Sequence, residues 1–499
     1  MFWPIYRTKK QRRRTNNSRQ KTRMLAVERL ETREVLSGLV TIGLPGGNNL
    51  SLTGDASNND VTVQETMPYN YKIVANGSTF LKLQDGSIVK EHTVNAVNGD
   101  ISVKLGTGSD TFELKESTRS PNLGDTRSNV YGNLDIENNL GQNTNIVENA
   151  HVHGDLKVQK IGTDLHGDCN LYITDTEVEG DTLIDNQVGG ANGDSFTEIR
   201  RSVLEGKLSV KNREGLDIVK IWDSDVGNDN GGNVDIQNGR GGSHVELNAT
   251  ETNTNTIYGN LTIKNGFNEI GVGILDEVTV RRTDAKGEMK IENGDGDTLV
   301  EIQESWIGSD LTKQDKGLTI ENKAGIDSVV MKDSVAYWDV TVKHDVSDPM
   351  AAWGSKTDIS DNLIGEHPLF CGADDALVVY GDNGRDTVRV AGNSIRGKVD
   401  IQTFLGHDVV DVINNQPISQ LYIRAGDGDD TVTLDQQTIS IETDIDLEAG
   451  RDLLRLKNGT KLKTEATLKG GAGINDIVEL DPDVEIIGYL FPGFENPAP

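Results

Sequence analysis

The chain has 499 residues, a formal charge of −30 and only 5% aromatic residues. The acidic excess argues against nucleic-acid binding, which needs a basic surface, and no apolar run approaches the ~20 residues of a membrane-spanning helix. With 55 glycines, the composition favours a thin core with many turns over several compact domains.

Residues 1–37 form a basic N-terminal segment. Residues 1–23 hold nine Lys or Arg and no acidic residue, and they lack the apolar stretch of an ordinary secretory signal. Such a run also suits a patch that binds nucleic acid or an anionic membrane.

The stretch after these basic residues resembles the LEPR-XLL motif near the N-termini of exported and surface proteins of planctomycete-type bacteria. The matching positions are Leu30, Glu31, Arg33, Leu36 and Ser37. Thr32 stands where that family usually has Pro, and Val35 where it often has Leu. The resemblance implies export to the cell surface or beyond; an amphipathic helix that caps the body is the structural alternative.

Residues 38–128 are expected to be β-rich N-terminal coils with a poorer register. From residue 129 to residue 344 a phrase recurs: Gly, any, apolar, any, apolar, any, Asn. It reads Gly132-Asn-Leu-Asp-Ile-Glu-Asn138 in one copy and Gly232-Asn-Val-Asp-Ile-Gln-Asn238 in another. Successive copies lie 22 to 29 residues apart, a period typical of repeat architectures.

Each repeat holds three short segments with the period of a strand that has one buried face. The second strand follows a Gly-rich break, as in Asp217–Ile221, and a third, shorter strand closes the unit, as in Glu177–Val178. Three short strands per repeat without helical periodicity predict one coil of a parallel β-solenoid. The fold class is therefore all-β: a single elongated parallel β-solenoid, expected to be right-handed.

The Asn at the end of the phrase recurs at one register and predicts a ladder of stacked amides. We also expect it to take the left-handed backbone conformation of a tight corner. Its members are Asn138, Asn186, Asn212, Asn238, Asn265, Asn293 and Asn322, with Lys160 interrupting the series and His344 ending it. The ladder is a structural signal and not a catalytic one.

Residues 345–368 hold Pro349, Trp353 and Pro368 and are expected to form an irregular insertion. Beyond it, residues 369–480 form Asp-rich coils. Their turns read Gly381-Asp-Asn-Gly-Arg-Asp386 and Gly426-Asp-Gly-Asp-Asp430 in two copies. These turns resemble single units of the calcium-binding RTX repeat.

Calcium is a candidate cofactor of these coils, because Asp supplies hard oxygen ligands. The ligand candidates are Asp382, Asp386, Asp427, Asp429, Asp430 and Asp476. RTX units recur every nine residues, whereas these turns are 22 to 24 residues apart. The alternative is that each Asp caps its turn by hydrogen bonds to the backbone, and this alternative is favoured.

No catalytic site is marked out. Arg200-Arg201 and Arg281-Arg282 form basic pairs, four tryptophans offer sugar platforms, and His151 and His153 share a strand face. The His pair lacks a third ligand, and rim or core positions explain the others more simply. Cys169 and Cys371 fall about 40 Å apart at the strand spacing, too far for a disulfide.

Residues 481–499 are expected to form a C-terminal tail that covers the last coil, because an open solenoid end exposes a sheet edge. For the whole chain we favour a non-catalytic, exported surface or extracellular-matrix repeat protein, adhesive and with calcium as a candidate stabiliser. Its expected partners are polysaccharide or other cell-surface components. The alternative is a carbohydrate-active β-helix enzyme, a lyase or hydrolase.

Overall fold

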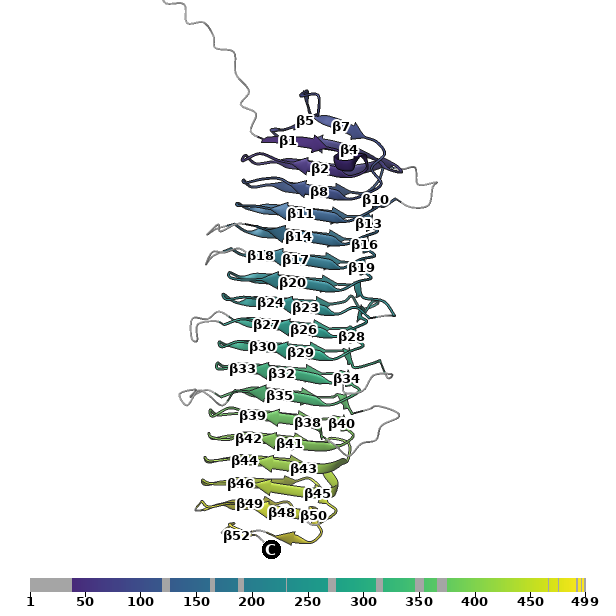
Figure 1. Ribbon diagram of the computed structural model, residues 1–499. Coiled ribbons are helices and arrows are strands. Elements are labelled where there is room, and N and C mark those ends of the chain that lie inside the picture. Colours follow the sequence, from purple (N-terminus) through teal and green to yellow (C-terminus); the bar gives the residue numbers. More distant parts are fainter. Residues whose placement is uncertain are drawn as a thin grey trace, which may run out of the picture. The chain divides into compact units, whose positions relative to one another are not determined.

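A computed structural model describes residues 38–118, 126–161, 167–186, 193–229, 231–267, 275–310, 317–345, 354–365, 375–464, 466–473, 475–490, 492–494 and 496–497. These residues belong to one compact unit, Leu36–Pro499. The unit is a stack of β-coils in which each strand pairs with the equivalent strand one coil away (Figure 1). The predicted all-β, parallel β-solenoid fold is therefore confirmed.

The first strands combine antiparallel and parallel pairing. β1 pairs antiparallel with β2, and β3 with β4, whereas β8 and β9 pair parallel with the next coil. β5 then pairs with β1, β6 with β5, and β7 with β4. The elements are β1 (Gly38–Gly43), the 3-10 helix η1 (Pro45–Gly47), β2 (Leu50–Thr53), β3 (Asp60–Met67), β4 (Asn70–Ala75), β5 (Thr79–Lys82), β6 (Ile88–Val89), β7 (Glu91–Val94), β8 (Ile101–Lys104) and β9 (Thr111–Lys115).

Sheet A contains the apolar positions of the repeated phrase. Its successive strands are β11 (Leu134–Asn138), β14 (Leu156–Lys160), β17 (Thr182–Asn186), β20 (Leu208–Asn212), β23 (Val234–Gln237), β26 (Leu261–Lys264), β29 (Met289–Glu292), β32 (Leu318–Asn322), β35 (Val340–His344), β38 (Asp375–Tyr380), β41 (Lys398–Gln402), β43 (Ile418–Arg424), β45 (Thr438–Asp446), β48 (Ala466–Lys469) and β51 (Tyr489–Leu490). Two short strands, β47 (Lys461–Leu462) and β50 (Glu485–Ile486), continue from the start of β45.

Sheet B contains the second strand of each repeat. Its strands are β12 (Asn143–Glu148), β15 (Cys169–Thr174), β18 (Ser195–Arg200), β21 (Asp217–Trp222), β24 (Ser243–Asn248), β27 (Asp276–Arg281), β30 (Thr298–Gln303), β33 (Asp327–Lys332), β36 (Lys356–Ser360), β39 (Thr387–Ala391), β42 (Val409–Ile413), β44 (Thr431–Asp435), β46 (Leu453–Lys457), β49 (Ile477–Leu480) and β52 (Asn496–Pro497).

Sheet C contains the short third strand of each repeat. Its strands are β10 (Ser128–Val130), β13 (Ala150–Val152), β16 (Glu177–Val178), β19 (Val203–Leu204), β22 (Asp225–Val226), β25 (Asn255–Ile257), β28 (Thr283–Ala285), β31 (Trp306–Ile307), β34 (Val335–Ala336), β37 (Leu363–Ile364) and β40 (Ser394–Ile395).

The core is a column of aliphatic side chains enclosed by the three sheets. Ile184, Val210 and Ile236 lie in register on successive sheet A strands and are fully buried. On each strand, the residues that flank these positions point outward, as the strand period requires. Each coil therefore buries its apolar face only against its neighbours, which lets the body extend without a larger core.

The predicted Asn ladder is confirmed from Asn186 to Asn322 as a chain of buried amides, whereas Asn138 Nδ2 donates to Cys169 Sγ at 3.7 Å. Asn186 Nδ2 donates to Asn212 Oδ1 at 2.9 Å, and the same bond repeats at 2.7–2.9 Å from Asn212 through Asn238, Asn265 and Asn293 to Asn322. The ladder continues into His344, whose Nδ1 lies 3.2 Å from Asn322 Nδ2. Lys160 interrupts it, since its ammonium group turns to the Gly141 and Gly167 carbonyls.

The left-handed corner expected of the ladder Asn was assigned to the wrong residues. Asn138, Asn186 and Asn212 end sheet A strands, and positive φ occurs instead at the corner after sheet B, as at Asp175 (51°) and Arg201 (47°). From Thr176 onward, the residue after most of these corners belongs to a second polar ladder that the sequence pattern did not predict. In it Ser202 N donates to Ser224 Oγ, and Asn362 N to Asn393 Oδ1.

Two expected boundaries differ from the structure. Within 345–368, the described residues 354–365 contain β36 and β37, which pair in register with the coils on both sides. Residues 481–497 do more than cover the last coil, because β50, β51 and β52 add strands to it. Phe494 joins the core there with 8% of its surface exposed.

Two smaller predictions depend on single residues. Cys169 is buried and free, and burial raises the pKa of its thiol to about 11. Cys371 lies outside the described residues, so the absence of a disulfide stays a prediction. In the described part of the chain, no helix has the length and apolar character needed to cross a membrane.

Candidate functional site

The Asp-rich coils stack five buried aspartates where sheet B begins. Each one directly precedes a sheet B strand and is at most 1% exposed. We call them the Asp column: Asp386, Asp408, Asp430, Asp452 and Asp476. Parallel pairing of β39, β42, β44, β46 and β49 places them one above another.

Each column carboxylate caps the coil before it. Asp408 Oδ1 accepts the Asp386 backbone N–H at 2.8 Å, and Asp430 Oδ1 accepts that of Asp408 at 2.8 Å. The same bond joins Asp452 to Asp430 at 2.9 Å and Asp476 to Asp452 at 3.0 Å. The column therefore satisfies the N–H that opens each strand, the role that turn capping predicts.

In four of these five carboxylates the second oxygen has no such role. Among the described residues, Oδ2 of Asp408, Asp430, Asp452 and Asp476 is buried without a hydrogen-bond partner. Burial, reinforced by the next carboxylate in the stack, raises the pKa of Asp408, Asp430 and Asp452 to about 7. Unpaired buried charge is costly, so a proton or a cation would stabilise these oxygens.

The six expected calcium ligands do not surround one point. Asp386, Asp430 and Asp476 belong to the column, and Asp382 is buried beside Asp386, whose Oδ2 accepts its backbone N–H at 2.9 Å. Asp427 and Asp429 are exposed, and Asp429 pairs with Arg451 at 3.2 Å. Ca²⁺ takes six to eight oxygens, and the unpartnered Oδ2 atoms are the ones that a cation would use.

A groove crosses the outer face of sheet A in the same coils. It has a volume of about 530 Å³ over β45 and β48, and Glu442, Asp444, Thr467 and Lys469 line it. Lys469 Nζ lies 3.5 Å from Asp444 Oδ1 and 3.1 Å from Asp446 Oδ2. The carboxylates of one coil therefore face the ammonium group of the next.

Aromatic and amide groups extend this face toward the preceding coils. Tyr422 Oη donates to Glu442 Oε2 at 2.5 Å, and Lys398 Nζ lies 5.2 Å from the centre of the Tyr422 ring. A second hollow of about 240 Å³ lies near the ends of β41 and β43, lined by Gln402, Phe404 and Arg424 among others. We call the region formed by residues 398–404, 420–424, 441–446, 464 and 466–469 the C-terminal sheet-A face.

Tyr422 and Lys469 are poorly suited to act as general bases. A hydrogen bond to Glu442, with burial, raises the pKa of Tyr422 to about 12, and hydrogen bonding to Asp446 raises the pKa of Lys469. A general base works best with a pKa near the operating pH. Ring faces, amides and paired charges instead present hydrogen bonds and a stacking surface.

The other candidates from the sequence form local contacts. Arg281 and Arg282 both pair with Glu304, and Arg201 pairs with Asp175. The Arg200 guanidinium lies 5.9 Å from the Trp222 ring centre. Trp353 lies outside the described residues, as do the export-type motif and the basic segment of residues 1–37.

Sequence reasoning missed the groove because its residues have no shared motif. Glu442 and Asp444 lie two residues apart on β45, a spacing that recurs in many strands, and Lys469 follows on the next coil. Only the coil register brings them together. Comparisons with protein-family models, curated proteins and solved structures give no significant match.

Proposed function

We propose that this is an exported, non-catalytic repeat protein of the cell surface or extracellular matrix, which adheres to polysaccharide through the C-terminal sheet-A face. The groove at Glu442, Asp444 and Lys469 is the observation that carries the proposal. The groove offers hydrogen-bonding groups from adjacent coils beside the aromatic side chain of Tyr422. The pKa values of Lys469 and Tyr422 are raised, away from the range of an efficient general base.

Charge selects the class of ligand. Asp444 and Asp446 already neutralise Lys469, and the chain carries a formal charge of −30. A polyanionic chain would be repelled. The face therefore suits uncharged, hydroxyl-rich polysaccharide, whose rings stack on aromatic side chains and whose hydroxyl groups bond to carboxylates and amides.

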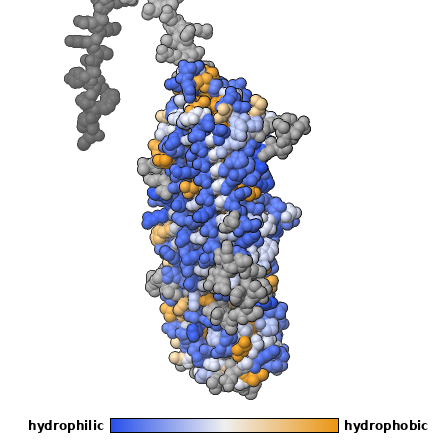
Figure 2. All heavy atoms as spheres, turned by 45° about the vertical axis from the view of Figure 1, so that its right-hand side comes forward, coloured by the Kyte–Doolittle hydropathy of each residue, from blue (hydrophilic) through white to orange (hydrophobic). Residues whose placement is uncertain are grey.

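The regular surface of the body is consistent with a structural role. The side of the molecule shown in Figure 2 is largely hydrophilic, with hydrophobic residues that are mostly scattered. Single exposed apolar residues are normal on a protein surface. The export part of the proposal is supported by the motif at Leu30–Ser37, and protease accessibility of the protein on intact cells tests it.

Binding to a panel of an uncharged glucan, a polyuronate and a glucosamine polymer tests adhesion. We expect binding to the glucan, weakened at least about fivefold by Tyr422→Ala, which corresponds to roughly 1 kcal/mol. Tyr172→Ala is the matched control, because Tyr172 lies half-buried on β15 of sheet B. The centre of its ring lies 5.4 Å from the centre of the Phe196 ring. Equal loss in both variants would contradict the assignment of the face.

A carbohydrate-active enzyme is the second candidate, and one observation favours it. Asp444 and Lys469 place an acid and a base on adjacent coils inside a groove, an arrangement that a lyase or hydrolase also uses. Chromatography of the same polysaccharides after prolonged incubation separates the two functions. Released oligosaccharide, abolished by Asp444→Asn, would establish the enzyme in place of the adhesin.

A further inference from the structure

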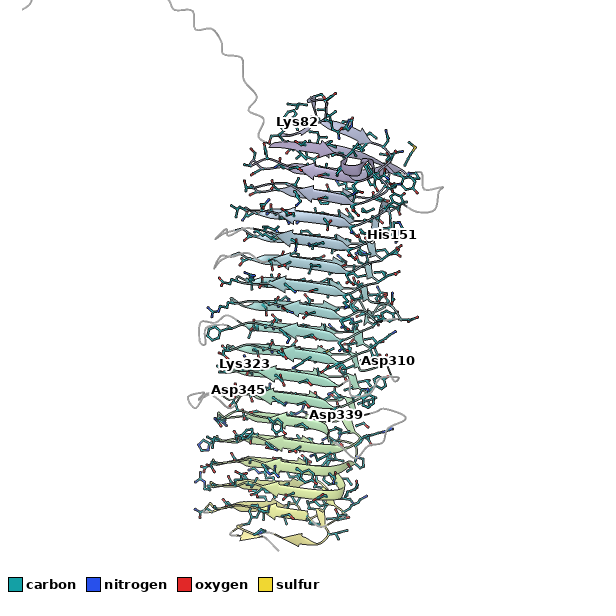
Figure 3. The ribbon with its side chains drawn as sticks, in the orientation of Figure 1. Lys82, His151, Asp310, Lys323, Asp339 and Asp345 are labelled. Atoms are coloured by element: carbon teal, nitrogen blue, oxygen red, sulfur yellow. The ribbon has the colours of Figure 1, made fainter. Side chains whose placement is uncertain are left out.

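A histidine cluster on sheet C lies far along the chain from the C-terminal sheet-A face. His151 is on β13 and His153 directly follows it, so their side chains share the outer face of the strand. His151 is labelled on the side of the stack where sheet C lies (Figure 3). The register pairs His151 with Glu177 and Val152 with Val178, which places Glu179 beside His153.

Glu179 supplies the third group that the sequence alone could not show. Its Oε1 lies 2.9 Å from His151 Nε2 and 2.8 Å from His153 Nδ1. One ligand atom from each residue lies within 4.8 Å of the others. Glu177 lies near the same cluster, with its Oε1 3.8 Å from His151 Nε2. Two imidazoles and a carboxylate are a common donor set for Zn²⁺.

We propose that His151, His153 and Glu179 form a binding site for a divalent transition-metal ion of the Zn²⁺ class. This proposal does not depend on the polysaccharide function. Tetrahedral Zn²⁺ with ligands at about 2.0–2.1 Å holds neighbouring ligand atoms about 3.3 Å apart. The two histidine nitrogens each need to move only about 0.5 Å away from Glu179 Oε1 to reach that spacing.

The surroundings favour a site that is held in place on one side and open on the other. The Tyr131 ring stacks on His153 at 5.7 Å, and the two imidazole rings lie 4.0 Å apart. The side chains of His151, His153 and Glu179 are 14%, 32% and 42% exposed. Three protein ligands with solvent access leave a fourth position for water or for a donor from a partner.

Titration of the full, tag-free chain with Zn²⁺ tests the site, using competition with a chromophoric chelator. We expect one Zn²⁺ bound at pH 7.5 and an affinity at least about tenfold weaker in His153→Gln, because even second-sphere losses cost 10–100-fold.

His244→Gln is the matched control. His244 also contacts two glutamates, with Nδ1 2.9 Å from Glu277 and Nε2 3.6 Å from Glu246. It is not part of the cluster of His151, His153 and Glu179. Its loss should leave Zn²⁺ affinity unchanged. Far-ultraviolet circular dichroism confirms that both variants fold. Stoichiometric Zn²⁺ binding that survives His153→Gln, or no binding by the parent protein, would overturn the proposal.

Discussion

The Asn-ladder coils (129–344) and the Asp-rich coils (369–480) carry different polar chemistry on one framework. An amide both donates and accepts, so each ladder Asn bonds to the next through side chains alone. A carboxylate only accepts, so each column Asp uses a backbone N–H, and four of the five leave one oxygen without a partner among the described residues. The first region contains a self-complementary stack of amides at the ends of its sheet A strands, whereas the second stacks carboxylates where sheet B begins.

In the Asn-ladder coils, different residue types occupy the start of each sheet B strand. From Ser195 to Asp327, Ser or Thr alternates with Asp there, and the hydroxyl donates to the carboxylate of the next coil. Ser195 Oγ lies 2.6 Å from Asp217 Oδ1, and Thr298 Oγ1 2.7 Å from Asp327 Oδ1. In the Asp-rich coils the donor residue is replaced by another Asp. Burial raises the pKa of Asp217 to about 7 as well, so carboxylates titrate in both regions. The second region differs because its carboxylates occupy consecutive coils with no hydroxyl donor between them.

The largest expected effect comes from the glycines that let the Asp turns stack. Gly428 has φ +153°, and a Cβ there would lie 1.3 Å from the Gly406 carbonyl oxygen. Gly428→Ala should therefore destabilise the Asp-rich coils by about 3 kcal/mol or more, measured by hydrogen exchange in those coils. Gly459→Ala is the control, since its Cβ would meet nothing closer than 3.6 Å. Similar losses in both variants would mean that backbone strain, not stacking, limits the turn.

Asn238→Asp should break the amide ladder at its centre. The new carboxylate can accept from Asn212 but cannot donate to Asn265, which leaves a buried charge and an unpaired oxygen. We expect a loss of about 2–4 kcal/mol at pH 8 in chemical unfolding, and a smaller loss at pH 5. Gln237→Glu makes the same charge change on the outer face, and it should cost much less.

The Asp column should make its own coils less stable as the pH rises. The pKa of Asp430 goes from 3.8 to about 7 on folding, so the folded coils bind extra protons between these values. Stability is then fully present below about pH 4, falls as the pH rises to about 7, and is level above it. Hydrogen exchange in the Asp-rich coils at pH 5 and pH 8, corrected for intrinsic rates, measures the change.

Asp430→Asn separates this effect from other titrations. Asn keeps the acceptor for the Asp408 N–H and places a donor near the unpartnered oxygens of the adjoining coils. We expect a gain of about 1–3 kcal/mol at pH 8 and little change at pH 5. Asp429→Asn in the same turn removes only an exposed pair with Arg451 and should shift stability by less than about 1 kcal/mol. A destabilised Asp430→Asn at pH 8 would show that the carboxylate is needed in its charged form.

The smallest expected effect is that of calcium. Because each column carboxylate directs one oxygen to a backbone N–H and two of the six expected ligands are exposed, we expect protons to stabilise the column. Adding Ca²⁺ or a chelator at pH 7.5 should shift the melting temperature by about 1 °C or less, since a bound ion stabilises in proportion to its affinity. A rise of several degrees with Ca²⁺, lost in Asp430→Asn, would establish the calcium-stabilised form.

The sequence predicted the parts of this fold that repeat with one residue type. Asn212 and Asn238 recur in the same phrase, so their stacking followed from the alignment of the copies. The second ladder escaped notice because Thr, Ser, Asn and Gln alternate in it, as at Ser224, Asn255 and Gln437. Glu179 and Lys469 were missed for a related reason: their partners lie one coil away, and only the register shows the contact.

The direction of the Asn ladder has an electrical consequence. From Asn186 to Asn322 every amide donates toward the C-terminal end, so the side-chain dipoles add along the axis as peptide dipoles do in a helix. The negative end is Asn186 Oδ1, buried without a partner among the described residues. The positive end faces His344 Nδ1, which directs its other nitrogen to Thr357 Oγ1 at 3.0 Å. The body thus contains a polar axis whose two ends are chemically distinct.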